Sequence, residues 1–506
     1  MKQLKIYFTS DMHGYVFPTD YRDHEDKSIG MLKLISNFDK DGNTIILDGG
    51  DTIQGSPFTT YLSKFHEPIN PIATIFNEAG YDFVTLGNHE FNYGFDYLKS
   101  YMLHLDAKCL CTNVQDNSNS FEILPYSIKT LENGLKVGVV GFTTDFIPIW
   151  EKPDNITNFT VVDTFQSVKK AHDEIRDKVD ILIGLYHGGF ECDVNTGKVL
   201  STSPENIGYK VCQQLDFDIL LTGHQHMSIP PTLIKNTYVV QPGHYCTNYV
   251  FIDAQINDDN KIASISGDLY TIGNTVNQKL FDKFSPLQQK IQNWLDKDVG
   301  HLDIALPPNQ HLDMALHGTY LANFINQVQL DRTGADISTT SLANSIKGFN
   351  QSVTIRDIVS TYVFSNTLAV IEVTGDIIKQ ALEVCARYFD VSGDKVSVDK
   401  HFTYPKVCHY NYDYFSGINY VFDTTKPVGE RVTSIKFKGT EITPDQKFTL
   451  ALNNYRATGV GDYSCYKGCP VVSEVLTDFA EIIIDYFTKY TNVTVDKTKY
   501  YEVLLP

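Results

Sequence analysis

The sequence predicts an α/β protein with more than one domain, and three observations support this prediction. Short apolar runs alternate with stretches of helical periodicity through the first half of the chain, a pattern typical of α/β layering. A length of 506 residues suggests two to four domains. The character of the sequence changes after about Gly273, where a polar stretch of helical periodicity begins.

The first half contains five apolar runs, each ending in a glycine or polar turn with side chains that commonly bind metals. The runs are LKIYFTSDMHG with Asp11 and His13, TIILDGGDTIQGSP with Asp51, FVTLGNHEFNYG with Asn88 and His89, ILIGLYHGG with His187, and ILLTGHQH with His224 and His226. Helix-period stretches, such as residues 30–38 and 165–179, lie between them. Because ligands of α/β sheets gather beyond the carboxyl ends of the strands, we expect the five turns to form one shared site. The alternative is that these side chains occur in the five turns by chance and form no shared site.

The stretch NQKLFDKFSPLQQKIQNWLDKDVG follows the first half and has helical periodicity. Its single proline, Pro286, is expected to open a helix at the first turn. We interpret residues 274–305 as a linker helix between a first domain, 1–273, and a second α/β domain, 306–506. A surface helix of the first domain is equally compatible with the pattern. The second domain contains the strand-like stretch KFTLALNNY, which is followed by a glycine turn.

The composition and charge limit the classes of partner. With 42% hydrophobic and 20% charged residues, the chain has the composition of a soluble globular protein. A net charge of -19 argues against a nucleic acid polymer or an anionic membrane as partner, because phosphate groups attract basic surfaces. A small anionic substrate remains compatible, since bound metals can reverse the local field. No apolar run is long enough for a transmembrane helix, and a monomer is expected.

The nine cysteines do not form a recognisable disulfide framework, although Cys465 and Cys469 in SCYKGC are close enough in sequence to pair. The N-terminal stretch MKQLKIYFTSD lacks the apolar core of a signal peptide. We therefore expect free thiols, a reducing compartment and a cytoplasmic location.

The donors of the five turns comprise two carboxylates, one amide oxygen and four imidazoles, counting His13 but not His89. This mixture suits Mn²⁺, Fe, Zn²⁺ or Co²⁺ and lacks the thiolates of a structural zinc site. Seven donors are too many for one ion and enough for two divalent ions if Asp51 bridges them. Two-metal sites activate a water and stabilise the attacking and leaving oxygens of a phosphoryl displacement.

His89 is expected to have a different role from the other histidines. It directly follows Asn88, so on a turn the two side chains diverge. If Asn88 faces a metal, His89 can face the substrate and protonate a leaving oxygen as a general acid. A turn histidine packed against the following helix is the alternative.

The motifs DMHG, GGDTIQGSP, GNHEF, YHGG and GHQH resemble those of the calcineurin-like metallophosphoesterases. They are most similar to the two-domain bacterial 5'-nucleotidase and 2',3'-cyclic-nucleotide 2'-phosphodiesterase group, as are YFSGINYVFD and NNYRATGVGDY near the C-terminus. The resemblance implies a four-layer αββα phosphoesterase domain and a C-terminal α/β nucleotide-binding domain.

The resemblance also implies roles for individual residues. Asp11, His13, Asp51 and His226 would hold one metal ion, and Asp51, Asn88, His187 and His224 would hold the other. His89 would be the catalytic histidine. Tyr412 and Tyr463 would sandwich the base of a nucleotide, a stacking interaction worth about 1–3 kcal/mol per base. For either tyrosine alone, a core or surface aromatic is the alternative.

Two departures from the 5'-nucleotidase pattern favour the branch of cyclic phosphodiesterases and 3'-nucleotidases, which GNHEFNYG and GHQH also resemble. Asn92 stands where 5'-nucleotidases carry an aspartate that pairs with the catalytic histidine; an amide can orient an imidazole but cannot stabilise its charge as a carboxylate does. The stretch FPTDYRD, soon after the first motif, also resembles the cyclic phosphodiesterase branch. The stretch SLANSIKGF has Asn344 and no phosphate-binding arginine. Arg456 in NNYRA is a candidate for contacting substrate, and a plain surface arginine is its alternative.

The expected function is two-metal hydrolysis of 2',3'-cyclic nucleotides to 3'-phosphates, and of these to nucleosides. A 5'-nucleotidase or nucleotide-sugar hydrolase with the same metal core is the second hypothesis. A non-catalytic nucleotide or metal sensor is a third, from a different class. A sensor derived from a hydrolase is expected to have lost ligands, whereas all seven donors and His89 are present here.

Overall fold

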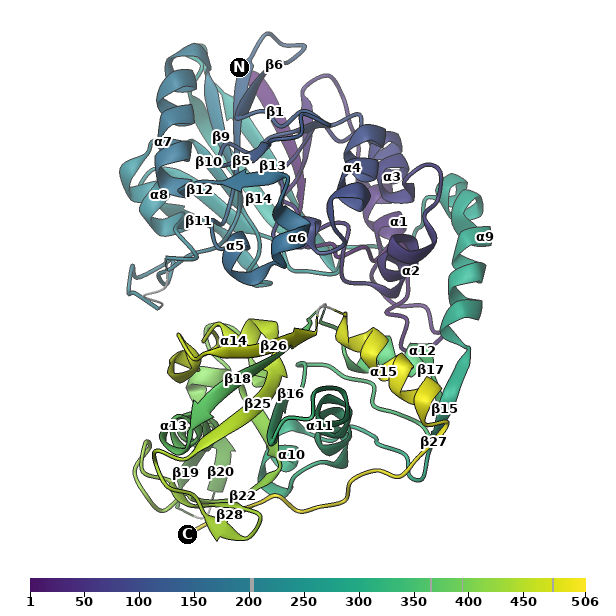
Figure 1. Cartoon of the computed structure of the whole chain (residues 1–506). Coiled ribbons are helices and arrows are strands. Elements are labelled where there is room, and N and C mark those ends of the chain that lie inside the picture. The colour runs from purple at the N-terminus through teal and green to yellow at the C-terminus, as the bar shows by residue number, and fades with distance from the viewer. Residues whose placement is uncertain (201–203, 365, 394, 476) are drawn as a thin grey trace. The chain divides into compact units, whose positions relative to one another are not determined.

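The computed structural model of the protein describes residues 1–200, 204–364, 366–393, 395–475 and 477–506 (Figure 1). The chain forms two compact units, Met1–Ile291 and Gln292–Pro506. The expected site residues of the five turns all belong to the first unit, and Asn344, Tyr412, Arg456 and Tyr463 belong to the second.

The first unit contains two six-stranded sheets, with strand orders β14-β13-β1-β2-β3-β4 and β11-β12-β10-β9-β7-β6. The first sheet comprises β1 (Lys2–Thr9), β2 (Thr44–Asp48), β3 (Phe83–Val84), β4 (Lys108–Cys109), β13 (Asn248–Ile256) and β14 (Ile262–Thr271). The second comprises β6 (Tyr126–Thr130), β7 (Lys136–Thr143), β9 (Ile181–His187), β10 (Ile219–Thr222), β11 (Ile229–Ile234) and β12 (Thr237–Gln241). Strands β1 to β4 are parallel, as are β7, β9, β10 and β12.

The two sheets pack face to face. Every residue of β2 and β9 is buried, as expected for parallel strands covered on both faces. One apolar cluster joins Ile6 and Leu47 of the first sheet to Val139 and Ile183 of the second.

Helices cover the outer faces of the two sheets. A second apolar cluster packs α7 (Thr164–Ile175) and α8 (Gly208–Gln214) on the second sheet. Helices α1 (Met31–Leu34), α2 (Pro57–Phe65), α3 (Pro71–Ala79) and α4 (Phe95–His104) lie on the side of the first sheet (Figure 1). The short helices α5 (Ile147–Trp150) and α6 (Pro153–Ile156), and the pair β5 (Val114–Asp116) and β8 (Phe159–Val161), complete the unit. The resulting layers are helix, sheet, sheet and helix, and the predicted α/β fold class is confirmed.

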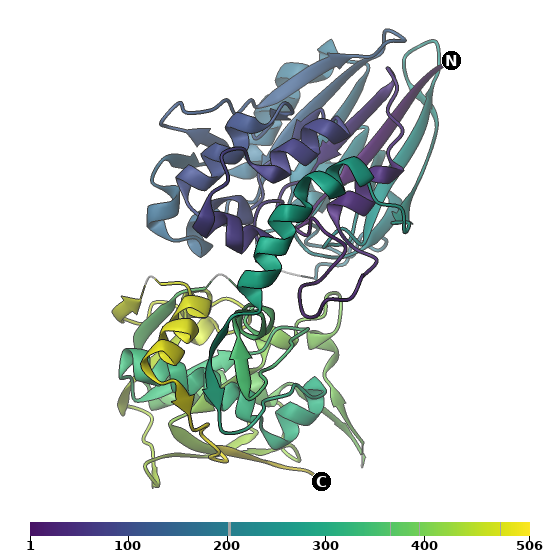
Figure 2. The same ribbon diagram turned by 90° about the vertical axis from the view of Figure 1, so that its right-hand side faces the viewer.

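The helix predicted after Gly273 is α9 (Gln278–Leu295), seen as one continuous helix in Figure 2. Pro286 lies inside this helix and not at its first turn, so that expectation was wrong. The helix begins earlier because Asn277 accepts a hydrogen bond from the N–H of Leu280 at 3.2 Å. Burial of Leu280, Ile291 and Leu295 compensates for the backbone hydrogen bond that a proline cannot make. The boundary between the compact units falls within α9, and the division at residues 273 and 305 stays a prediction.

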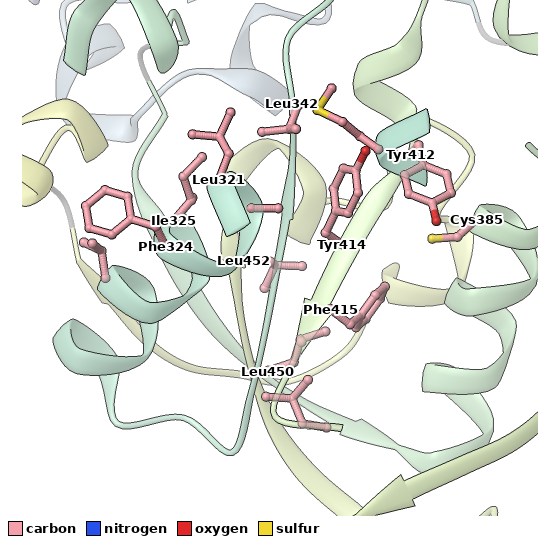
Figure 3. Packing of buried hydrophobic residues seen from close by; sticks show 14 of the residues in the cluster. Leu321, Phe324, Ile325, Leu342, Cys385, Tyr412, Tyr414, Phe415, Leu450 and Leu452 are labelled. Carbon is pink, nitrogen blue, oxygen red and sulfur yellow. The ribbon is translucent and has the colours of Figure 1, made fainter. Parts of the chain in front are cut away.

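The second unit is built around a five-stranded sheet with the order β21-β16-β25-β18-β26. Its strands are β16 (Ile337–Ser341), β18 (Leu368–Thr374), β21 (Asp413–Ser416), β25 (Lys447–Asn453), which is the strand expected in KFTLALNNY, and β26 (Val471–Val475). Phe324 and Ile325 of α11 (Tyr320–Thr333) pack with Leu450 and Leu452 of β25 in one large core (Figure 3). The core also contains Tyr412, one of the two tyrosines expected to stack on the base of a nucleotide.

Smaller elements surround this sheet. Two further sheets have the orders β17-β15-β27 and β24-β23-β22-β28, and β19 pairs with β20. Their strands are β15 (Asp298–Leu302), β17 (Ser352–Thr354), β19 (Phe389–Ser392), β20 (Lys395–Val398), β22 (Ile418–Asp423), β23 (Val432–Phe437), β24 (Thr440–Glu441), β27 (Asn492–Val493) and β28 (Tyr501–Leu504). The other helices are α10 (His311–His317), α12 (Ile355–Thr361), α13 (Gly375–Ala386), α14 (Asn454–Ala457) and α15 (Phe479–Lys489).

All nine cysteines are free, as the sequence predicted. The five in the first unit and Cys385 in the second are buried, whereas Cys408, Cys465 and Cys469 are partly exposed. Among the described residues, no helix combines the length and the apolar character that crossing a membrane requires.

Candidate metal centre

The turns after β1 and β2 are joined through their backbones. The N–H of Asp11 donates to the carbonyl of Gly50 at 2.9 Å, and the N–H of His13 donates to the carbonyl of Asp51 at 2.8 Å. From the facing sheet, His187 ends β9 and His224 follows β10. Because the parallel strands of each sheet end at one edge, side chains far apart in sequence meet there.

The structure places ligand-type side chains in two groups that share Asp51. One group is Asp11, His13, Asp51 and His226, and the other is Asp51, His187 and His224; within each, the candidate ligand atoms all lie within 4.8 Å of one another. Asn88 joins the second group, since its Oδ1 lies 3.2 Å from His187 Nε2 and 2.9 Å from His224 Nδ1. All seven predicted donors therefore meet in one cluster.

Three of the four rings are held by an oxygen on the side away from the cluster. His13 Nδ1 donates to the Gln54 carbonyl at 2.9 Å, and His187 Nδ1 donates to the Gly49 carbonyl at 2.6 Å. His224 Nε2 lies 2.8 Å from the Glu205 carboxylate. Because these oxygens only accept hydrogen bonds, each fixes the proton on the outer ring nitrogen and leaves the inner nitrogen able to bind a metal.

The inner atoms crowd one another. His13 Nε2 lies 2.9 Å from His226 Nε2, and His187 Nε2 lies 3.2 Å from Asp51 Oδ2. Acceptor atoms at such distances repel each other unless a proton or a cation lies between them. The donor set, without any thiolate, suits divalent Mn, Fe, Zn or Co. The residues present thus fit two divalent ions.

The electrostatics also favour positive charge at the centre. Burial lowers the pKa of His13 to about 3, so its ring is neutral and able to act as a ligand. Burial would raise the pKa of Asp51, but the neighbouring His187 and His89 outweigh it and hold that pKa well below its usual range. Burial would likewise lower the pKa of His187, yet the Asp51 carboxylate raises it to about 10. Asp51 is therefore an anion paired with His187 in this structure, and a bound cation would replace the proton that they share.

Five of the seven donors have a backbone that L-residues rarely adopt. The φ angles are 54° at Asp11, 49° at His13, 55° at Asp51, 71° at His224 and 55° at His226. A left-handed conformation costs a residue other than glycine about 1–2 kcal/mol. Strain of this kind gathers at functional sites, where the surrounding structure imposes it.

The tight approach of the turns depends on Gly87 and on Glu90. A Cβ at Gly87 would lie 2.2 Å from Asp51 Oδ1, so no larger residue fits there. The buried Glu90 carboxylate accepts hydrogen bonds from the N–H groups of Asp51, Thr52 and Gly87 at 2.6–2.8 Å. Burial raises the pKa of Glu90. Its place directly after His89 in GNHEF was the signal in the sequence that it serves this site.

His89 lies beside the donor cluster. Its ring centroid is 5.3 Å from that of His13, and its N–H donates to Asp51 Oδ1 at 2.8 Å. Its Nδ1 bonds Asn92 Oδ1 at 2.5 Å, so Asn92 is placed to orient the ring as expected. The catalytic role of either residue stays a prediction.

Besides Glu90, sequence reasoning missed Glu205, Trp150 and Glu151, which contact this set. Glu205 holds His224, and Trp150 stacks on the His224 ring with centroids 5.5 Å apart and planes 17° apart. Glu151 accepts a hydrogen bond from the Asn92 side-chain amide. These residues lie in stretches without a recognisable motif, so the sequence offered no signal for them.

The two tyrosines expected to stack on a base, Tyr412 and Tyr463, are both buried in the second unit. Tyr412 is 2% exposed and Tyr463 is 0% exposed, and Figure 3 shows Tyr412 within the apolar core. The Tyr412 hydroxyl donates to the Ala315 carbonyl at 3.2 Å, and the Tyr463 hydroxyl donates to the Asn411 carbonyl at 3.1 Å. The burial of both rings is in keeping with the core alternative, and their stacking on a base stays a prediction.

Arg456 is not the surface arginine of the alternative, and a role for it in contacting substrate stays a prediction. It is 2% exposed and pairs with the buried Asp413 through two hydrogen bonds of 2.9 and 3.1 Å. Its guanidinium also lies 4.2 Å from the Tyr463 ring centroid. Asn344 is exposed, and its side chain donates to the Val407 carbonyl at 2.8 Å and accepts from the His409 N–H at 2.9 Å. A role for Asn344 in substrate binding stays a prediction.

Comparison with known proteins agrees with this arrangement. The calcineurin-like phosphoesterase family matches residues 4–228, and the C-terminal domain of 5'-nucleotidases matches residues 299–468. A solved structure named putative 5'-nucleotidase from Staphylococcus aureus, in complex with alpha-ketoglutarate, is 32% identical, with 100% of each chain covered and a TM-score of 0.90. The chain belongs to the calcineurin-like phosphoesterases with a 5'-nucleotidase C-terminal domain. The predicted family is confirmed, and this phosphoesterase is a hydrolase of phosphoester bonds.

Two curated relatives are more distant in sequence. A 2',3'-cyclic-nucleotide 2'-phosphodiesterase/3'-nucleotidase of Yersinia enterocolitica is 25% identical over 91% of the phosphoesterase and 82% of its own length. The trifunctional nucleotide phosphoesterase protein YfkN of Bacillus subtilis is 25% identical over 97% of the phosphoesterase. The chain spans only 38% of the YfkN length. Calcineurin-like phosphoesterases are dimetal enzymes, in keeping with the two donor groups.

Proposed function

We propose that this phosphoesterase hydrolyses phosphoesters of nucleotides, with 2',3'-cyclic nucleotides and 3'-nucleotides as its preferred substrates. The observation that carries the proposal is the convergence of two donor groups on Asp51, with His89 beside them. When bound, two divalent ions supply an activated water and stabilise charge on the phosphoryl oxygens. Asp11, His13, Asp51 and His226 would hold one ion, and Asp51, Asn88, His187 and His224 the other.

The protein's own residues supply the proton for the leaving group. Because His89 Nδ1 bonds Asn92, Nε2 is the ring nitrogen that can give up a proton. In a 2',3'-cyclic substrate, His89 would protonate the departing 2'-oxygen of the ribose, which leaves a 3'-phosphate. The same group would then protonate the 3'-oxygen when that monoester is cleaved to the nucleoside.

The choice of branch rests on Asn92, on the lack of an arginine at Asn344, and on relatives. Relatives named 2',3'-cyclic-nucleotide 2'-phosphodiesterase/3'-nucleotidase, from Yersinia enterocolitica and Salmonella typhimurium, support hydrolysis of nucleotide phosphoesters. The name of the Staphylococcus aureus structure favours the second candidate, a 5'-nucleotidase. A nucleotide-sugar hydrolase belongs to that second candidate, since it would use the same metal core.

The deciding experiment is an assay of the Mn²⁺-loaded protein on 2',3'-cAMP, 3'-AMP and 5'-AMP in parallel. Higher kcat/KM for the first two is the expected result. A preference for 5'-AMP would overturn the choice of branch and leave the phosphoesterase activity intact. No phosphate release from any substrate, with both metals bound, would overturn the enzymatic proposal in favour of a nucleotide or metal sensor.

The proposal also covers the identity of the metal ions, the cellular compartment and the oligomeric state of the protein. The mixed donor set supports Mn, Zn, Fe or Co, and metal analysis of the protein purified from its own cells would identify them. Nine free thiols support a reducing, cytoplasmic compartment. We expect a monomer that takes a small nucleotide as substrate, which light scattering at assay concentration would check.

A further inference from the structure

We propose that Glu151 is a positioning residue that fixes the proton of His89 through the side-chain amide of Asn92. The inference deepens the proposed function and rests on it, because His89 is the proton donor there. It concerns a chain of three side chains, His89, Asn92 and Glu151, which is described as the relay from here on.

The contacts of the relay run in one direction. His89 Nδ1 bonds Asn92 Oδ1 at 2.5 Å, and Asn92 Nδ2 donates to Glu151 Oε2. The other oxygen of Glu151, Oε1, accepts from Asn155 Nδ2 at 2.9 Å and from the Lys152 N–H at 2.7 Å. Asn155 Nδ2 also donates to the Asn92 carbonyl at 3.0 Å. Both oxygens of Glu151 are therefore held, one by the Asn92 side chain and the other by Asn155 and the Lys152 N–H.

The carboxylate decides which way the amide faces. An asparagine side chain has a donor end and an acceptor end and can present either one to an imidazole. A carboxylate accepts hydrogen bonds and donates none, so Glu151 selects the Asn92 orientation with its NH₂ toward Glu151 and its oxygen toward His89. That oxygen requires a proton on His89 Nδ1. Nε2 is left as the nitrogen that exchanges a proton with the substrate.

The relay also supplies a negative charge near His89, which Asn92 lacks and an aspartate at position 92 would carry. An amide alone stabilises an imidazolium less than a carboxylate does. A chain of hydrogen bonds that ends in a carboxylate polarises the amide between them and makes its oxygen a better acceptor. Glu151 thus places the negative charge one side chain farther from His89 than an aspartate at position 92 would.

The location of Glu151 connects the relay to the donor cluster. It directly follows α5, whose last residue, Trp150, stacks on the His224 ring. Asn155 lies in α6, the next helix. Trp150 thus contacts a predicted metal ligand, His224, and the adjacent Glu151 contacts Asn92, which orients the predicted proton donor.

The test exchanges the two ends of the amide–carboxylate pair. Glu151→Gln gives two facing amides, with no carboxylate to select the orientation of Asn92. Asn92→Asp gives two facing carboxylates, which repel each other. The double variant, Asn92→Asp with Glu151→Gln, restores complementarity: the carboxylate introduced at position 92 accepts from His89 Nδ1 on one oxygen and from the glutamine NH₂ on the other. Glu122→Gln, an exposed change in the same unit, is the matched control.

We expect each single variant to lower kcat by about 10–100-fold, the range for residues that orient a catalytic or ligand group, with KM changed less than about threefold. The double variant is expected to recover to within about threefold of the parent, and Glu122→Gln to equal the parent. Losses that simply add in the double variant would overturn the proposal, because a structural role has no reason to be rescued by the exchange.

A second measurement does not depend on activity. The ¹⁵N spectrum of histidine-labelled protein distinguishes Nδ1–H from Nε2–H tautomers, and His89→Gln identifies the His89 signals. We expect Nδ1–H in the parent and in the double variant, and a mixture in Glu151→Gln. A parent without any phosphoesterase activity would refute the proposed function, while the tautomer would still report on the relay. An unchanged tautomer in Glu151→Gln would overturn the proposal even in a fully active enzyme.

Discussion

The two units bury charged side chains in opposite ways. In the first unit, Asp51 and His187 are buried among other acceptor atoms that converge on them. In the second, Arg456 and Asp413 are equally buried, but they satisfy each other and the Arg456 guanidinium also donates to backbone carbonyls. The contrast separates a cluster of ligand-type atoms that two cations would satisfy from an ion pair whose members satisfy each other. Burial and charge alone do not identify a functional site; the convergence of ligand-type atoms from several strand ends does.

The backbone shows the same contrast. Among the described residues of the second unit, only Lys438 and Asp462 combine a side chain with a left-handed φ, and neither is a predicted site residue. The first unit places Asp11, His13 and Asp51 in that conformation within one cluster. A left-handed backbone at predicted metal ligands therefore distinguishes the first unit from the second. The predictions below test the differences between the two units.

The largest effect is expected from Asp51→Asn, because Asp51 belongs to both donor groups. The amide removes the negative charge shared by both ions, so kcat should fall more than about a thousandfold, given the several kcal/mol that metals contribute to the transition state. Phosphate release and metal content by mass spectrometry measure the result. Asp259→Asn, an exposed change, should behave as the parent. Two bound ions and normal turnover in Asp51→Asn would show that the Asp51 carboxylate is not needed to bind metal, and the contrast with the Arg456–Asp413 pair would fail.

Arg456→Met should destabilise the second unit by about 3–5 kcal/mol, because it leaves the Asp413 carboxylate buried without a partner. Urea unfolding followed by fluorescence measures this loss, and the exposed Arg332→Met is the control. A changed KM with unchanged stability would instead return Arg456 to the substrate site.

Glu205→Gln should weaken metal binding by about 10–100-fold, because the Glu205 carboxylate orients His224. Titration calorimetry with Mn²⁺ measures the affinity. The expected pattern is weaker binding of one ion and little change in the other, since His224 belongs to only one donor group. Equal weakening of both sites would argue for a general change in the fold.

His226→Gly and His226→Ala should both lose metal affinity but differ in stability. Both remove the imidazole, whereas only glycine relieves the φ of 55° at this position. The metal-free glycine variant should therefore be more stable than the alanine variant by about 1 kcal/mol. Thermal unfolding of the two metal-free variants compares them. Equal stabilities would show that the left-handed backbone carries no strain.

The smallest effect is expected in the second unit, at His409. Burial, together with the stacked His311, lowers the pKa of His409 to about 4. Because the folded pKa is below the unfolded value of about 6.5, the contribution to stability is complete above about pH 6.5 and is lost as the pH falls toward about 4. His409→Gln should flatten the dependence of the unfolding midpoint on pH in this window. An unchanged slope would exclude His409 as its source.

The sequence predicted what depends on short, local motifs. The strand-end turns bearing Asp11, Asp51 and His224 could be placed because parallel strands bring their carboxyl ends to one edge. Long-range partners could not be placed: Glu151 and Glu205 approach the site from loops whose paths depend on tertiary packing. Tyr412 matched a motif, but whether its ring faces solvent or core is decided by how α10, β21 and β28 pack, which one sequence does not reveal.

The distribution of thiols makes the two units separately observable. The five cysteines of the first unit are buried, whereas the second unit has three that are partly exposed. Burial raises the pKa of these three thiols, to about 11 for Cys408 and Cys465, so the reaction needs a mildly alkaline buffer. An alkylating reagent should then modify Cys408, Cys465 and Cys469 in the native protein and reach the others only during transient opening. Peptide mapping after brief alkylation would then record how often the first unit opens, with and without added metal, in a protein that needs no introduced label.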